Sequence, residues 1–182
     1  MILQLLITIG VSQALALAVM ILWKQQKSQA DFLLSIELLL LFLITIFFNY
    51  KVELNTYVAG IGLNAIVLAY LALPVFYFYV KAAAHGRLDP KRWYNWLHFV
   101  PFLIVAVLMY SQFYALPPAD RCCLVETMGQ EDHPLWFNGM YYGLFLLMFP
   151  LYIFLSFRVL KKHEAYILTK FSYTEDINLG WL

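Results

Sequence analysis

The chain has 182 residues, of which 63% are hydrophobic and only 13% are charged. A typical soluble domain carries about 25% charged residues and about 45–50% apolar residues. One water-soluble core cannot hide this surplus of apolar surface, so the composition argues against a soluble globular protein and favours a lipid environment. The formal net charge of +1 gives no indication of a charged partner.

Five apolar runs are long enough to cross a hydrocarbon core, which takes about 20 residues of helix. Backbone polar groups in lipid must be satisfied within the segment, so each run is predicted to be helical. No basic residue precedes the first run, which is therefore predicted to be a retained helix and not a signal peptide. We expect one all-α membrane domain over 1–182, with spans at about 2–23, 32–50, 57–80, 97–115 and 137–160.

Lysine and arginine are unevenly distributed between the predicted loops. The first loop, the third loop and the C-terminal segment carry ten of the twelve basic residues, and these three segments share one side of a five-span bundle. Because positively charged loops stay in the cytoplasm, we expect the N-terminus outside and the C-terminus in the cytoplasm. The ten are Lys24, Lys27, Lys81, Arg87, Lys91, Arg92, Arg158, Lys161, Lys162 and Lys170, against Lys51 and Arg121 on the other side.

The longest predicted outer loop, 111–136, is acidic and interrupted by prolines. We expect it to be irregular, and any ligand is expected at this loop or in the cavity behind it. The loop contains the only two cysteines, Cys122 and Cys123. Because they are adjacent, they are unsuited to a disulfide framework or a zinc site.

Residues 161–182 are predicted to form a cytoplasmic juxtamembrane segment. Ser172 and Glu175 have the spacing of a capping box, and apolar residues then follow up to Leu182. A helix is therefore predicted to begin where the sequence stops, and we expect the chain to be a fragment of a longer protein.

Glu37 is the most informative single residue, because it lies about 9 Å of helix rise beyond Asp31 inside the second predicted span. An ionisable side chain at that depth is costly and usually faces a bundle interior or a watery cavity. One interpretation is a proton- or cation-sensitive position, or a polar contact that couples helices. The other is a neutral or snorkelling glutamate near the cytoplasmic interface, with an asparagine or tyrosine partner.

Two further polar residues, Asn64 and His98, lie in or near the third and fourth spans. A lone histidine at a membrane interface is more often a hydrogen-bonded packing residue than a ligand. Pro74, Pro101 and Pro150 each fall within a predicted span, where proline removes a backbone donor and is expected to kink the helix.

Enzyme signatures are absent from the sequence. His163 and Glu164 begin a zincin-like motif, but Ile167 stands where the second histidine is required. There is no P-loop, dinucleotide-binding or nucleophile-elbow motif, and the four histidines are spread over both sides of the predicted bundle. We therefore expect no catalytic activity, no cofactor and no metal site.

Several segments, taken in order along the chain, carry a family resemblance. They cover the passage from the first span into the second, aromatic stretches in the third and fourth spans, and the closing segment, which is the most specific. The segments are Leu15–Lys24 with Lys27, Ala30–Leu33, Leu73–Pro74 to Phe78–Val80, Leu97–Phe102 and Phe171–Leu182.

Together these segments resemble the N-terminal membrane region of bacterial membrane-bound transcriptional regulators with AraC-type DNA-binding domains. Similar regions precede some sensor histidine kinases. The resemblance covers nearly the whole chain, and it implies that one or two more spans and a cytoplasmic helix-turn-helix domain would follow Leu182. The DNA-binding part is therefore missing from this chain, and the family implies no ligand residues by position.

The resemblance implies a sensory domain of the bacterial inner membrane that relays a stimulus to a cytoplasmic DNA-binding or kinase module. A small-molecule transporter or channel fragment, with Glu37, Asn64 and the prolines lining a pathway, is one alternative, and a non-catalytic scaffold subunit is another. The expected partners are the lipid bilayer, an unidentified small-molecule or envelope stimulus, DNA only through a missing C-terminal domain, and, as an option, a second copy in a homodimer.

Overall fold

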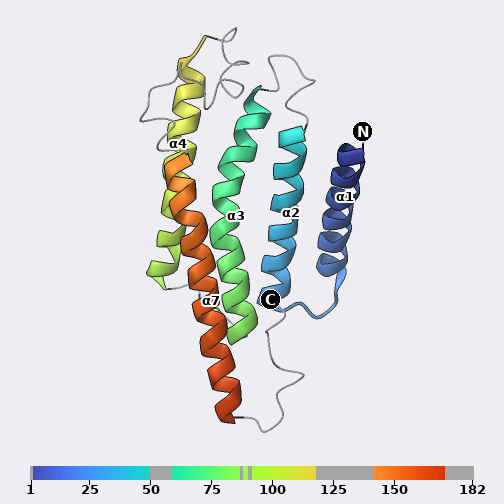
Figure 1. The fold of residues 1–182 in the computed structure, drawn as a ribbon, viewed down its shortest axis with the longest axis vertical. Helices are drawn as coiled ribbons and strands as arrows, with labels where there is room; N and C mark the ends of the chain where they lie inside the picture. Colours follow the sequence, from blue (N-terminus) through green and yellow to red (C-terminus); the bar gives the residue numbers. More distant parts are fainter. Residues whose placement is uncertain (1, 50–58, 87, 90–91, 118–141, 171–182) are drawn as a thin grey trace.

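The computed structural model describes residues 2–49, 59–86, 88–89, 92–117 and 142–170. The regular structure within these residues is all helical, as predicted, and five helices are long and apolar enough to cross a membrane. They run alternately down and up, with the start of the first helix at the upper end in Figure 1. The elements are α1 (Ile2–Trp23), α2 (Gln29–Asn49), α3 (Ala59–His85), the 3₁₀ helix η2 (Trp93–Phe99), α4 (Val100–Ala115) and α7 (Leu144–Lys170).

The helices follow the predicted spans but differ from them at the ends. α2 begins at Gln29 instead of about 32, and α3 continues past 80 to His85. α7 continues to Lys170, through residues that the sequence placed in the juxtamembrane segment. The predicted span ends at 50, 57–58 and 137–141, the loop residues 118–136 with both cysteines, and the segment 171–182 lie outside the described residues.

The turn between α1 and α2 is closed by a reciprocal cap. The backbone N–H of Ser28 donates to Asp31 Oδ2 (2.9 Å), and the backbone N–H of Asp31 donates to Ser28 Oγ (3.0 Å). Each side chain thus satisfies a donor that the first turn of a helix leaves free. Lys24 Nζ donates to the same carboxylate oxygen at 2.8 Å, so the end of α1 is tied to the start of α2.

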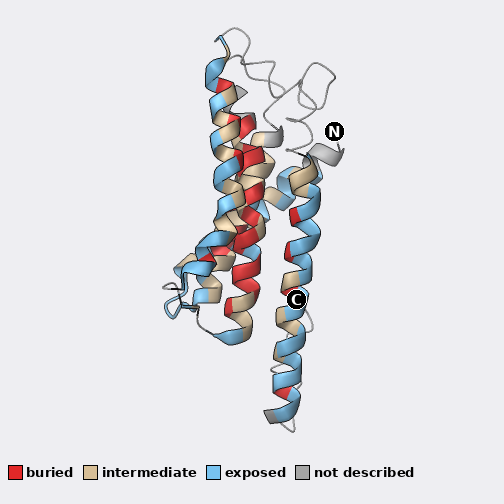
Figure 2. Cartoon of the chain, turned by 90° about the vertical axis from the view of Figure 1, so that its left-hand side faces the viewer, coloured by how far each residue is buried: buried red, intermediate tan, exposed pale blue. Residues whose placement is uncertain are grey.

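The centre of the bundle is α3, which packs against α2, α4 and α7, whereas α1 packs against α2. In its apolar stretch Leu63–His85, 67% of the residues are buried, compared with 6% in α1 and 17% in α2. Figure 2 shows the buried residues running along α3, with the flanking helices largely exposed. The exposed faces are as apolar as the buried ones, which suits helices whose outer surface meets lipid.

The main core lies where α3 meets α4 and α7. Tyr70 of α3 is fully buried, and its ring meets that of Phe145 in α7 edge-on, with the ring centroids 5.6 Å apart. Val105 and Met109 of α4 are also fully buried in this cluster. A smaller apolar cluster joins α2 to α3 through Leu40, Ala72 and Val75.

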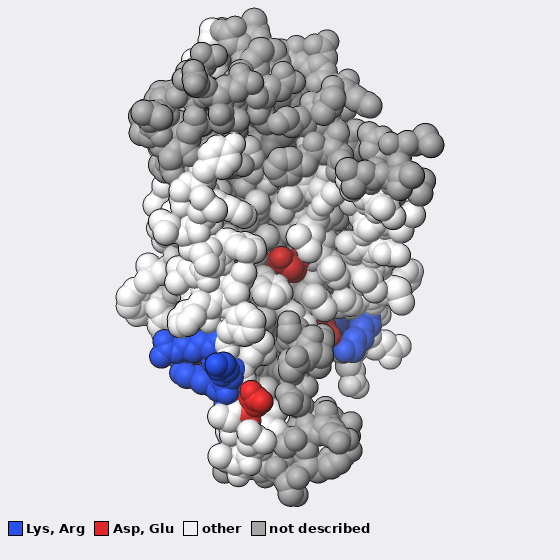
Figure 3. All heavy atoms as spheres, in the orientation of Figure 1, with Lys and Arg blue, Asp and Glu red and all other residues white. Residues whose placement is uncertain are grey.

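Charged side chains mark one end of the bundle. In Figure 3 the lysines and arginines visible on this face lie towards the lower end, and most of the described surface above them is uncharged. Four parts of the chain lie at this end in Figure 1: the end of α1, the end of α3, the start of η2 and the second half of α7. We call this the basic end; its described members are Lys24, Lys27, Lys81, Arg92, Arg158, Lys161 and Lys162.

Candidate functional site

A cluster of aromatic rings joins α3, η2 and α7 just inside the basic end. We call it the His98 junction and define it as His98 of η2, Tyr77 and Phe78 of α3, and Tyr152 of α7. The His98 ring lies 5.1 Å from the Tyr77 ring, 5.4 Å from Phe78 and 5.7 Å from Tyr152, centroid to centroid. Tyr77, Phe78 and Tyr152 are all buried. Three separate chain segments therefore meet around one imidazole.

Two hydrogen bonds join His98 to Tyr152. The Tyr152 hydroxyl donates to the backbone carbonyl oxygen of His98 at 3.1 Å, and the same hydroxyl oxygen lies 3.2 Å from His98 Nδ1. A tyrosine hydroxyl has one proton, and here it goes to the carbonyl, so Nδ1 is the donor of the second bond. The pair fixes the position of α7 against η2, and it satisfies a carbonyl of the 3₁₀ helix in an apolar environment.

A lysine lies over the neighbouring rings. Lys81 Nζ is 5.7 Å from the centroid of Tyr77, 5.8 Å from Phe78 and 5.7 Å from Tyr94, within the range of cation–π attraction. It also donates a hydrogen bond to Asn95 Oδ1 at 3.2 Å, and Asn95 Nδ2 donates to the Asp89 carbonyl oxygen at 2.9 Å. Lys81 thus ties the end of α3 to η2.

Local geometry explains why these side chains meet. Lys81 follows Tyr77 by four residues and Phe78 by three, which places all three on one face of α3. In a 3₁₀ helix residues three apart lie on the same side, so Asn95 and His98 both face α3 from η2. The arrangement therefore depends on η2 being a 3₁₀ helix where the sequence predicted only the approach to the fourth span.

The three polar residues singled out from the sequence lie at different places. His98 is in the junction described above. Asn64 lies towards the other end of α3, where its Oδ1 accepts a hydrogen bond from the hydroxyl of Tyr110 in α4. Glu37 is buried in α2, 8% exposed, and within the described residues its Oε2 has no hydrogen-bond partner. The structure therefore does not bring the three together in one site.

The prolines also differ in their settings. Pro74 and Pro150 lie inside α3 and α7, and both helices continue through them. Pro101 lies in the first turn of α4, directly after η2. A missing N–H costs little in the first turn of a helix, so Pro101 is compatible with the start of α4 at Val100, and the expected kink at Pro101 stays a prediction.

Sequence reasoning missed Tyr152, Lys81 and Asn95. The hydroxyl of Tyr152 is a polar group inside an apolar run, and this could have drawn attention to it. Many other aromatic residues lie in the same run, so Tyr152 did not stand out. Tyr152 is 54 residues from His98 in the chain, and no local pattern links the two. Comparisons of the chain with models of known protein families, with curated proteins and with solved structures find no match.

Proposed function

We propose that the chain is a membrane sensory domain in which α7 carries a signal to the cytoplasm. The chain would span the bacterial inner membrane five times, with its N-terminus outside and its C-terminus inside. The clustering of the described basic residues at one end supports this orientation, because positively charged flanks stay in the cytoplasm.

The observation that carries the proposal is the pair of hydrogen bonds between His98 and Tyr152. Most of the described contact between helices is apolar, and many small van der Waals contacts hold these helices together. A paired hydrogen bond is directional, so it selects one position of α7 relative to η2. Breaking it releases α7 to a second position, and signalling of this kind requires two such packings.

The length of α7 supports its role as the output element. It runs without interruption from Leu144 to Lys170, past the basic residues Arg158, Lys161 and Lys162. A displacement at Tyr152 therefore passes along one continuous helix into the cytoplasm. In this proposal a stimulus on the outer face or within the bundle shifts the packing of α7, and a module beyond this chain reads the shift.

A fusion experiment tests the proposal. The chain is fused after Leu182 to a cytoplasmic helix-turn-helix output domain, and transcription from its promoter is compared between wild type, Tyr152→Phe and Tyr166→Phe. Tyr166 is the control because it lies on the same helix and is 57% exposed. We expect Tyr152→Phe to change basal transcription and Tyr166→Phe to leave it unchanged. Equal transcription from all three would contradict the proposal.

Orientation is tested separately with reporters placed after Leu182. Green fluorescent protein is expected to fluoresce there, and alkaline phosphatase is expected to be inactive, because that end would lie in the cytoplasm. An active phosphatase would overturn the topology and the sensory proposal with it.

Glu37 supports a second candidate, a transporter or channel component. A buried carboxylate whose Oε2 has no hydrogen-bond partner among the described residues is what a site for a proton or a small cation requires. Proton or cation flux into proteoliposomes tests this, with Glu37→Gln as the comparison. Flux that is lost in Glu37→Gln would favour transport over signalling.

A further inference from the structure

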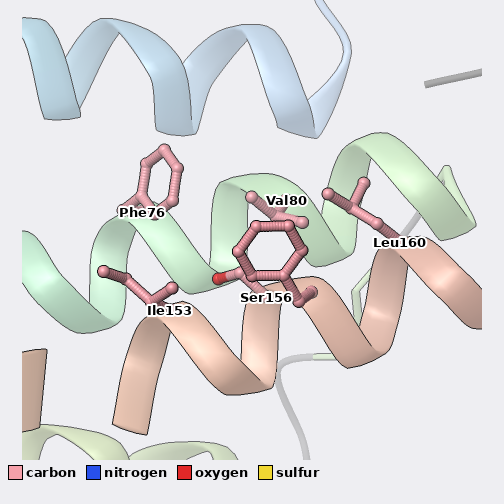
Figure 4. A pocket seen from close by; sticks show the side chains of 6 residues that line it. Phe76, Val80, Ile153, Ser156 and Leu160 are labelled. Carbon is pink, nitrogen blue, oxygen red and sulfur yellow. The ribbon is translucent and has the colours of Figure 1, made fainter. Parts of the chain in front are cut away.

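A pocket lies between α3 and α7, close to the basic end. Its volume is about 190 Å³. A cavity of roughly 150 Å³ takes a molecule the size of benzene, so this pocket has room for part of one hydrocarbon chain. Its lining is apolar except for one serine, as Figure 4 shows; the residues are Phe76, Val80, Ile153, Ser156, Phe157 and Leu160.

Ser156 differs from the other hydroxyl side chains of these helices. It is only 5% exposed, yet within the described residues its Oγ has no hydrogen-bond partner. In lipid a serine or threonine normally donates to a carbonyl of the preceding helical turn. Several others in this chain do so: Ser12, Ser35, Thr45, Ser111 and Thr169. The Ser156 hydroxyl instead lies between the two helices at the pocket (Figure 4).

The pocket lies just before the basic residues of α7, on the side of the bundle centre. Ser156 precedes Arg158 by about 3 Å of helix rise and Lys161 by about 7.5 Å, whereas Ile153 lies about 4.5 Å deeper. Arg158, Lys161 and Lys162 are exposed. Lys161 directly follows Leu160, which lines the pocket. From the basic residues towards the centre of the bundle, α7 thus presents the cation Lys161, then the apolar pocket from Leu160 to Ile153 with the Ser156 hydroxyl in its middle.

We propose that the α3–α7 pocket binds one anionic phospholipid of the cytoplasmic leaflet. Part of one acyl chain fills the slot beside Ile153 and Phe76, an ester carbonyl accepts the hydrogen bond from Ser156, and Lys161 pairs with the phosphate. The inference rests on the membrane orientation proposed above but not on signalling.

Photo-cross-linking in proteoliposomes tests the site. The probe is phosphatidylglycerol with a diazirine in one acyl chain, near its ester, and cross-linked peptides are mapped by mass spectrometry. We expect cross-links on 153–160 of α7 and 76–80 of α3. Ser156→Ala should lower their yield roughly threefold to tenfold, as expected for the loss of one hydrogen bond. Ile153→Trp, which fills the slot, should reduce the yield to background.

Matched variants separate a specific site from general lipid contact. Ser111→Ala removes a hydroxyl that is already bonded to its own helix, and Leu147→Trp adds bulk at an exposed position of α7, 71% exposed. Both should leave the yield unchanged, whereas Lys161→Gln should lower it for phosphatidylglycerol but not for phosphatidylcholine. Elution of each variant as a single monodisperse species shows that it is folded.

Three results would overturn the inference. Cross-links spread evenly over α1 and the outer faces, or unaffected by Ile153→Trp, would indicate general lipid contact only. Absence of lipid cross-links at the pocket, together with a dimer captured by a bifunctional protein cross-linker in the same proteoliposomes, would identify a second copy as the occupant. Proteolysis of the same proteoliposomes reports the orientation independently. If the orientation is as proposed but the pocket binds no lipid, the lipid inference is wrong and the sensory proposal is unaffected.

Discussion

The α1–α2 side of the bundle and the α3–η2–α7 side are built differently. On the first, α1 has 6% of its apolar stretch buried, and Lys24 ties it to α2 through a hydrogen bond to Asp31 at the turn. The second side contains the His98 junction, with its buried aromatic rings and two hydrogen bonds between His98 and Tyr152. Lys81 lies over three rings beside it. Apolar packing places a helix beside its neighbour, and polar contacts with fixed direction further restrict its register. The difference predicts where substitutions will matter.

The largest effect is expected from Tyr70→Ala in the core between α3 and α7. Tyr70 is fully buried, and its loss leaves a cavity and removes the edge-on contact with Phe145, costing about 3–5 kcal/mol of unfolding free energy. Met20→Ala in α1, where the side chain is 68% exposed, should cost less than about 0.5 kcal/mol. SDS titration in mixed micelles measures both. Equal losses would mean that the two sides are not built differently.

Tyr152→Phe should cost about 1–3 kcal/mol, because it keeps the ring but removes both hydrogen bonds to His98. The same titration applies, with Tyr166→Phe as the exposed control. A stability equal to that of wild type would show that these bonds contribute nothing to the position of α7.

Lys81→Met is expected to cost about 1–2 kcal/mol. The substitution keeps most of the aliphatic stem but loses the attraction to the rings of Tyr77, Phe78 and Tyr94 and the hydrogen bond to Asn95. Lys162→Met removes an exposed charge from α7 and should have little effect. If both lysine variants lose the same unfolding free energy, the contacts of Lys81 with the rings and Asn95 add no stability beyond that of an exposed lysine.

The smallest effect is expected from Asp31→Asn at the α1–α2 turn, about 0.5–1 kcal/mol. The substitution loses the ion pair with Lys24, whose side chain is 55% exposed, but an amide oxygen still accepts from the Ser28 N–H. Raising the salt concentration should shrink the difference from wild type, since exposed ion pairs are screened. A difference that persists in high salt would place this pair in a less exposed setting than the structure does.

The helices themselves were predictable from the sequence, because a run of about 20 apolar residues in lipid has no alternative to a helix. Which helix is central was not. In water, a helix shows its buried face as an apolar stripe, but here Leu146 and Leu147 point outwards and Met148 inwards, and all three are apolar. In α3, too, exposed Phe76 lies between buried Val75 and Tyr77, so apolar character did not mark α3 as the centre of the bundle.

The candidate site was predictable only in part. His98 and Asn64 stood out because polar residues are rare inside spans, and both make hydrogen bonds to a tyrosine. Their partners did not stand out, since the chain has 13 tyrosines. The 3₁₀ geometry that turns Asn95 and His98 to one side was also not predicted, because the sequence indicated only the approach to the fourth span.

The distance between η2 and α7 tests the central claim most directly. Spin labels at positions 93 and 154, where Trp93 is 73% and Phe154 62% exposed, are introduced after both cysteines, Cys122 and Cys123, are replaced by serine. Pulsed electron paramagnetic resonance in nanodiscs then gives the distance distribution. The account predicts one narrow distance in the wild-type background and a second, shifted population in Tyr152→Phe. Identical distributions in the two would contradict the role of the His98 junction in setting the position of α7.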